Sequence, residues 1–201
     1  IFLAMGKDPA TALYIYFVEP LTSSSGLSEV AVKAGPLVLI GIGLSFGFRA
    51  GIWNIGAEGQ ILAGAMGAAW VARIGGAWPG PMLLTGMLVG AIVGGGLLAL
   101  VPALARARIG VNEIITTLML NEIALRLLQW LIHGPWKDPD SFNFPLTPML
   151  PDQGHLPTLF ERAHIGVLIA GAVILVFGVA ASRTAWGYEL RVAGSSADTA
   201  R

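Results

Sequence analysis

The 201-residue chain is 55% hydrophobic and 12% charged, with zero formal net charge and a mean hydropathy of +0.72. A neutral chain lacks the basic surface that nucleic acids require, so no nucleic-acid partner is expected. The absence of cysteine excludes disulfides and thiolate metal sites within these residues. The apolar runs are long enough to lie in lipid, which predicts an all-α, polytopic transmembrane helical bundle.

In chain order, the apolar runs predict one transmembrane domain over residues 1–201, truncated at both ends. Spans are expected at about residues 1–6, 32–48, 57–73, 82–104, 113–133 and 164–182. Outer loops are expected at 7–31, with a short interfacial helix around 10–18, and at the proline-rich segment 134–163. The polar segment 183–201 would be cytoplasmic, because the arginines favour an orientation with Arg106 and Arg108 inside.

Small residues recur at four-residue spacing in two neighbouring spans. Such a stripe predicts a smooth face for close helix packing, and it carries no function by itself. The residues are Gly59, Ala63 and Gly67 in one span and Gly86, Gly90 and Gly94 in the next.

The stretch Phe48–Gly64, FRAGIWNIGAEGQILAG, places polar residues and four glycines between two apolar runs. Glycines let the backbone leave the helix, and polar groups at membrane depth persist only beside protein or a water-filled path. We therefore expect a broken helix at the solute pathway, with Asn54, Glu58 and Gln60 as pathway residues.

The span that begins near Asn112 carries polar residues on two sides. At 100° per residue, Glu113, Thr116, Thr117 and Asn121 share one face, while Glu122, Arg126 and Gln129 lie roughly opposite. Glu122 would lie near the bilayer midplane with Arg126 as its partner. One interpretation makes the face from Asn112 to Asn121 a pathway wall and the other face a bundle contact. The alternative is that both faces are structural contacts.

Three catalytic or metal-binding interpretations are weaker. Ser45 lies in a Gly-x-Ser-x-Gly pattern, but an intramembrane hydrolase would need a histidine or lysine beside it. His155, His164 and Asp152 have no recognised metal-ligand spacing. No P-loop pattern occurs, so ATP hydrolysis would belong to another chain.

Two motifs, FRAGIWNIGAEGQILAGA and GVNEIITTLMLNEIA, resemble permease subunits of ABC importers. The resemblance is to the nucleoside and simple-sugar branch, related to ribose and branched-chain amino acid permeases, and it covers essentially the whole chain. The family usually has an aromatic residue where Glu122 stands. The closing GYELRVAGSSADTAR resembles the family's segment that docks on the ATPase, and this implies coupling roles for Tyr188, Glu189, Arg191, Gly194 and Asp198.

The resemblance implies a non-enzymatic transport subunit, without a cofactor, in the bacterial plasma (inner) membrane. Its expected partners are a cytoplasmic ATP-binding subunit, a second permease subunit (identical or different), an extracytoplasmic solute-binding protein and the lipid bilayer. The expected solute is a nucleoside; a simple sugar or a branched-chain amino acid is the alternative. A structural membrane protein without a pathway is the alternative outside transport, and mutual pairing of Asn54, Glu58 and Gln60 inside the protein would favour it.

Overall fold

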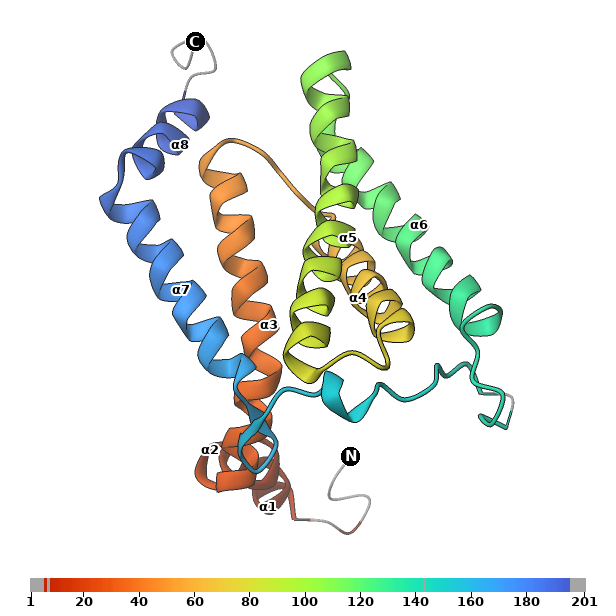
Figure 1. Cartoon of the computed structure of the whole chain (residues 1–201). Coiled ribbons are helices and arrows are strands. Elements are labelled where there is room, and N and C mark those ends of the chain that lie inside the picture. Colours follow the sequence, from red (N-terminus) through yellow and green to blue (C-terminus); the bar gives the residue numbers. More distant parts are fainter. Residues whose placement is uncertain (1–5, 7, 143, 196–201) are drawn as a thin grey trace. The chain divides into compact units, whose positions relative to one another are not determined.

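The computed structural model describes residues 6, 8–142 and 144–195, and its secondary structure is almost entirely helical (Figure 1). The helices are α1 (Pro9–Leu13), a π-helix (Tyr14–Val18), α2 (Glu19–Thr22), α3 (Ser24–Arg49), α4 (Ala57–Ile74), α5 (Gly80–Ile109), α6 (Glu113–His133), a 3₁₀ turn (Asp152–Gly154), α7 (Gly166–Arg183) and α8 (Ala185–Ser195). One short hairpin pairs β1 (Thr158–Phe160) antiparallel to β2 (Ala163–His164). The all-α class predicted from the sequence is confirmed.

Four described helices are long and apolar enough to cross a membrane: α3, α5, α6 and α7. The segment α4, with Glu58, Gln60 and Arg73 among its 18 residues, is not one of them, although the sequence predicted a span there. The predicted remnant at 1–6 lies outside the described residues except for Gly6.

Several helix ends differ from the sequence-based boundaries. Helix α3 begins at Ser24 rather than near residue 32, because the Ser23 hydroxyl accepts the N–H of Gly26 at 3.1 Å and caps the first turn. Helix α5 continues to Ile109 rather than ending near residue 104, so Arg106 and Arg108 lie on its last turn. It ends at Gly110, whose φ of 67° few other residues adopt. The segment predicted as an outer loop is helical over residues 9–22.

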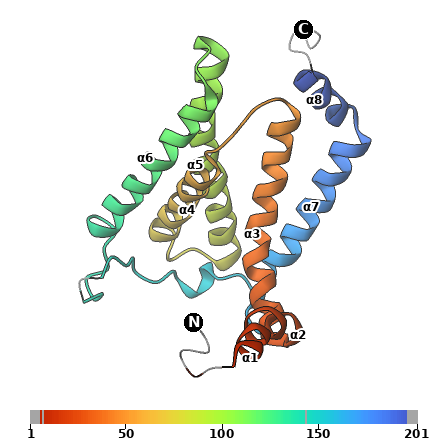
Figure 2. The same ribbon diagram turned by 180° about the vertical axis from the view of Figure 1, so that it is seen from behind.

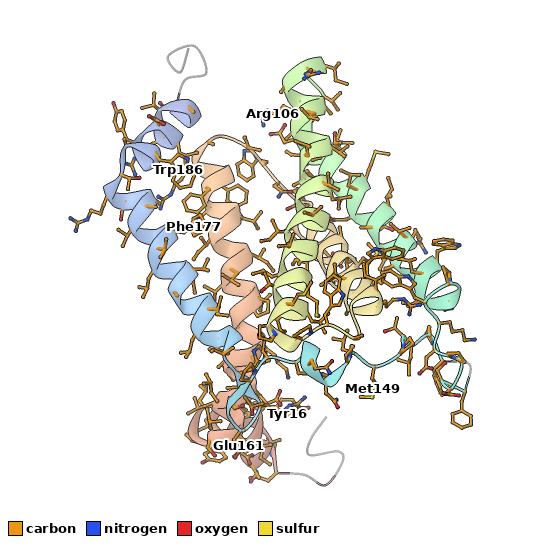
Figure 3. All side chains as sticks on the ribbon, in the orientation of Figure 1. Tyr16, Arg106, Met149, Glu161, Phe177 and Trp186 are labelled. Carbon is orange, nitrogen blue, oxygen red and sulfur yellow. The ribbon has the colours of Figure 1, made fainter. Side chains whose placement is uncertain are left out.

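The chain forms two compact units, residues 1–46 with 156–201, and residues 47–155. In the first unit, the fully buried Ser28 accepts the N–H of Arg162 at 2.9 Å, and Glu29 pairs with the Arg162 guanidinium at 2.7 Å. Phe46 of α3 packs against Phe177 of α7 and Trp186 of α8, with ring centroids 5.7 and 5.0 Å apart. Figure 3 labels these last two aromatic side chains.

In the second unit α4 packs closely along α5, beside α6, as both views of the ribbon show (Figures 1 and 2). The predicted small-residue stripes face each other. A Cβ added at Gly67 would clash with the carbonyl of Gly90, and one at Gly94 with the carbonyl of Ala63. The stripes are therefore packing surfaces, as predicted, and they bring the polar start of α4 beside α5.

Candidate functional site

The polar stretch between α3 and α4 is an irregular segment, residues 50–56, that precedes the first turn of α4. Gly51 has φ 71°, a conformation that glycine adopts without strain, and the backbone turns there. The side chain of Asn54 then accepts the N–H of Gly56 at 2.8 Å. The helix is thus broken as the sequence predicted, and its freed backbone groups need partners.

One face of α6 supplies those partners at four-residue intervals. Glu113 accepts the N–H of Trp53 at 3.3 Å, the hydroxyl of Thr117 accepts that of Ile55 at 3.2 Å, and Asn121 accepts that of Gly59 at 2.7 Å. The amide of Asn121 also donates to the carbonyl of Ile55 at 2.9 Å. At 1.5 Å per residue these contacts descend about 12 Å along α6.

A charged group from α5 secures the start of this segment. The guanidinium of Arg106 contacts the carboxylate of Glu113 and donates to the carbonyl of Gly51 at 3.4 and 3.5 Å. Figure 3 labels Arg106 toward the C-terminal end of α5. The side chain of Glu113 is 15% exposed and that of Arg106 is 40% exposed. The carboxylate therefore joins α5, α6 and the irregular segment.

A cavity of about 320 Å³ lies beside these contacts. Its polar lining comes from Asn54, Gln60, Arg106, Glu113 and Thr117, and its remaining walls are mainly apolar. The two amides face each other, with Asn54 and Gln60 joined by hydrogen bonds of 3.3 and 3.4 Å. The full lining is Ile52, Trp53, Asn54, Gln60, Ala99, Pro102, Ala103, Arg106, Ala107, Glu113 and Thr117.

The structure brings the predicted pathway residues together only in part. Asn54, Gln60, Glu113 and Thr117 line the cavity, and Asn121 is bound to backbone one turn further along α6. Glu58 is exposed on the first turn of α4 and is not a lining residue. Asn112 caps α6 by accepting the N–H of Ile114, while Thr116 donates to the Asn112 carbonyl.

The opposite face of α6 makes few contacts. Glu122 and Arg126 lie 3.8 Å apart, with 67% and 72% of their side chains exposed. Arg126 also donates to Gln129 at 3.2 Å. The bundle-contact role that one sequence interpretation gave to this face is not seen here; the face from Glu113 to Asn121 makes the bundle contacts instead.

The predicted coupling residues lie on α8. Tyr188, Glu189, Arg191 and Gly194 are exposed. Arg191 in addition donates to the carbonyl of Ala181, near the end of α7, at 3.0 Å. Gly187 lies against the backbone of Ala181, where a Cβ would clash, so α8 packs closely on that helix end. Asp198 lies outside the described residues.

The catalytic and metal-binding interpretations gain no geometric support. The hydroxyl of Ser45 donates to the Ile42 carbonyl of its own helix at 2.7 Å, as helical serines commonly do. Across the described part of the chain, no three histidine or carboxylate residues come together as metal ligands.

Sequence reasoning missed two contributors to the cavity. In the sequence analysis, Arg106 serves only to orient the chain. Its position seven residues before Glu113, on the other side of a short connection between two predicted helices, could have indicated an ion pair. No role is assigned to Trp53 from the sequence, but this residue lines the cavity and packs against Phe48 with ring centroids 5.1 Å apart and planes tilted by 44°. Its position in the irregular segment could not be read from periodicity.

Comparison with known proteins gives curated relatives among ABC permeases. The chain is 39% identical to the glucose ABC transporter permease TsgB13 of Haloferax volcanii, over 99% of this chain and 55% of that protein. It is 32% identical to the guanosine permease NupP of Bacillus subtilis, over 84% of this chain and 49% of that protein. For the nucleoside permease NupB of Lactococcus lactis the identity is 26%, over 98% and 57%.

The chain spans about half the length of these curated relatives. No solved structure matches it. A family model described as "branched-chain amino acid transport system / permease component" matches residues 26–201. The motifs, the apolar helices and these matches agree, and the chain belongs to this family of ABC transporter permease components.

Proposed function

We propose that the protein is the membrane-spanning permease subunit of an ABC importer in the plasma (inner) membrane. A separate cytoplasmic ATP-binding subunit would drive it, a second permease subunit would complete the pathway, and an extracytoplasmic binding protein would deliver the solute. Family membership supports the class of protein, and four apolar helices support multiple membrane crossings.

The observation that carries this proposal is the polar, non-helical segment bonded along the first half of α6, a helix long and apolar enough to cross a membrane, so that the segment would lie within the bilayer. Backbone outside a helix is tolerated there only inside protein or beside a water-filled cavity. The segment 50–56 has both protein partners and an adjoining cavity. Its N–H groups at Trp53 and Ile55 donate to Glu113 and Thr117, and its Ile55 carbonyl accepts from Asn121. Such broken helices with exposed polar groups are typical of solute sites in transporters.

Within this proposal the cavity is part of the solute route. Asn54 and Gln60 provide amide donors and acceptors, Glu113 a carboxylate, and Trp53 an aromatic wall. The pairing of Arg106 with Glu113 leaves the lining without excess charge. A neutral polar solute suits this lining better than an ion would, because an ion would find no uncompensated countercharge.

For the solute we propose a nucleoside, with a simple sugar as the second candidate. Two relatives are named for guanosine and nucleosides, and the relative with 39% identity is named for glucose. These solutes share a hydroxylated ring. A branched-chain amino acid, suggested by the family description, remains the third possibility to test.

One contact favours the structural alternative for part of the site. Asn54 and Gln60 bond to each other, as residues with a purely internal role would. Glu58 does not join them and stays exposed. Substitution separates the two roles: Asn54→Ala should impair uptake with normal membrane insertion if the amide lines the route.

The direct experiment measures uptake of labelled guanosine, and in parallel of labelled glucose and leucine, by cells that carry the complete operon, with and without this subunit. Unlabelled inosine, glucose, ribose and leucine serve as competitors. We expect uptake that depends on the subunit and is inhibited by inosine. Subunit-dependent uptake of glucose or leucine alone would assign that compound as the solute in place of a nucleoside. Unchanged uptake of every solute without the subunit would contradict the permease assignment.

A further inference from the structure

Helix α6 has two polar faces, and among the residues that the structure describes only one of them bonds to other elements. The face with Glu113, Thr117 and Asn121 is bonded to the broken segment. On the other side Glu122 and Arg126 keep 67% and 72% of their side chains exposed. Their contacts are with each other and with Gln129, on the same helix.

The position of this pair along α6 makes its exposure significant. Glu122 is nine residues from the start of a 21-residue helix, which is about 14 Å along a rod of about 32 Å. An apolar membrane core is about 30 Å thick, so the pair lies near mid-depth. Ionised side chains at this depth face water or protein and avoid lipid.

The composition of this face suits an uncharged, hydroxylated solute. Glu122, Arg126 and Gln129 follow one another at i, i+4 and i+7, and the exposed indole of Trp130 lies beside them. Carboxylate, guanidinium and amide groups bond hydroxyls, and an indole offers a flat apolar wall. The carboxylate and guanidinium compensate each other, so the face attracts no ion.

We propose that this face, defined by Glu122, Arg126, Gln129 and Trp130, lines the aqueous route at mid-depth and contacts the hydroxylated ring of the solute. The inference rests on the proposed importer function and names a second solute-contacting surface. The cavity beside Asn54 and Gln60 lies on the opposite side of α6 and nearer the start of that helix, so the two surfaces would contact the solute at different depths of the route.

Thiol accessibility tests whether water reaches this face. The 201 residues lack cysteine, so one introduced thiol can be read once any cysteine elsewhere in the polypeptide is replaced. Met119→Cys and Gln129→Cys lie on the face and retain the ion pair. Leu127→Cys is the matched control, because this 46% exposed residue lies between Met119 and Gln129 along the helix but about 110° around it from the centre of the face.

The assay uses the full-length complex in membranes and a charged methanethiosulfonate reagent. We expect modification of Met119→Cys and Gln129→Cys at least about tenfold faster than that of Leu127→Cys, because only a hydrated thiol ionises and reacts readily. Saturating guanosine or glucose should slow the reaction. Equal rates at all three positions, or no reaction on the face, would show that lipid or protein covers it and would overturn the proposal.

Uptake kinetics test the solute contact itself. Gln129→Ala and Glu122→Gln should raise the KM for uptake by about tenfold, the effect of losing one hydrogen bond to a polar partner. Leu127→Ala should leave the KM unchanged. Normal kinetics in Gln129→Ala and Glu122→Gln, in a complex that still transports, would reject this surface and leave the importer assignment intact. A wild-type complex without uptake would instead count against the importer assignment, while thiol accessibility still reports on the face.

Discussion

Asn121 and Gly59, 62 residues apart in the chain, are joined by a hydrogen bond of 2.7 Å from the glycine N–H to the asparagine side chain. The same side chain donates to the carbonyl of Ile55 at 2.9 Å. One residue of α6 therefore satisfies a donor in the first turn of α4 and an acceptor in the broken segment, both of which would otherwise be left unpaired.

Replacing Asn121 with alanine should destabilise the second unit, because both backbone groups would lose their partner. Each unpaired buried group costs about 1–3 kcal/mol, so a large fall in the midpoint of thermal unfolding in detergent is expected. Asn121→Asp keeps the acceptor for Gly59 and loses the donor for Ile55, so its unfolding midpoint should lie between those of the wild type and Asn121→Ala. A midpoint equal to that of the wild type in Asn121→Ala would show that the bond contributes nothing.

The packing of α4 on α5 predicts a second outcome. Gly67→Ala and Gly94→Ala would each place a methyl group against a facing carbonyl, and overpacking of this kind costs about 1–3 kcal/mol. Gly96→Ala is the matched control on α5, the helix that carries Gly94, because a Cβ at Gly96 meets nothing within 4 Å. Gel filtration should show less monodisperse protein, and thermal unfolding a lower midpoint, for Gly67→Ala and Gly94→Ala but not for Gly96→Ala. Equal loss in all three would indicate a general helix effect.

The ion pair of Arg106 and Glu113 should couple the two helices that it joins. Glu113→Gln can still accept the N–H of Trp53 but gives up the charge, whereas Arg106→Leu removes both the pair and the bond to Gly51. A double-mutant cycle on thermal unfolding should give a coupling energy of about 1 kcal/mol, as for partly exposed pairs. Strictly additive effects would mean that the contact contributes no net stability.

Helix α8 carries the predicted contacts with the ATP-binding subunit. Glu189→Arg reverses an exposed charge without an internal contact to lose, and we expect about tenfold weaker co-purification of that subunit. Tyr188→Ala should act similarly through lost contact area. Arg191→Glu would also release the carbonyl of Ala181, so Arg191→Gln is the variant that preserves a donor there. Full co-purification of Glu189→Arg would remove α8 from the docking surface.

The sequence predicted the helical class and a break within Phe48–Gly64 because apolar runs and clustered glycines are local signals. The glycine stripes also predicted the α4–α5 packing, since close approach requires small residues on both helices. Helix ends were less predictable: the start of α3 depends on a cap at Ser23 that a serine-rich run does not specify uniquely.

The candidate site was predictable in composition and only partly in arrangement. Periodicity placed Glu113, Thr117 and Asn121 on one face of α6, and the structure agrees. Which face meets the bundle could not be derived from the sequence, because both carry polar groups at similar depth. The partners of that face are backbone groups of residues 53–59, and backbone leaves no side-chain pattern to detect.

The most direct test of the importer account is ATP-dependent accumulation of labelled guanosine in proteoliposomes. They would contain the purified full-length permease complex and its ATP-binding subunit, with the binding protein on the opposite side. The account predicts accumulation that requires ATP hydrolysis, is lost when this subunit is omitted, and has a raised KM in Gln129→Ala. An assembled complex that hydrolyses ATP but accumulates none of guanosine, glucose or leucine would contradict it.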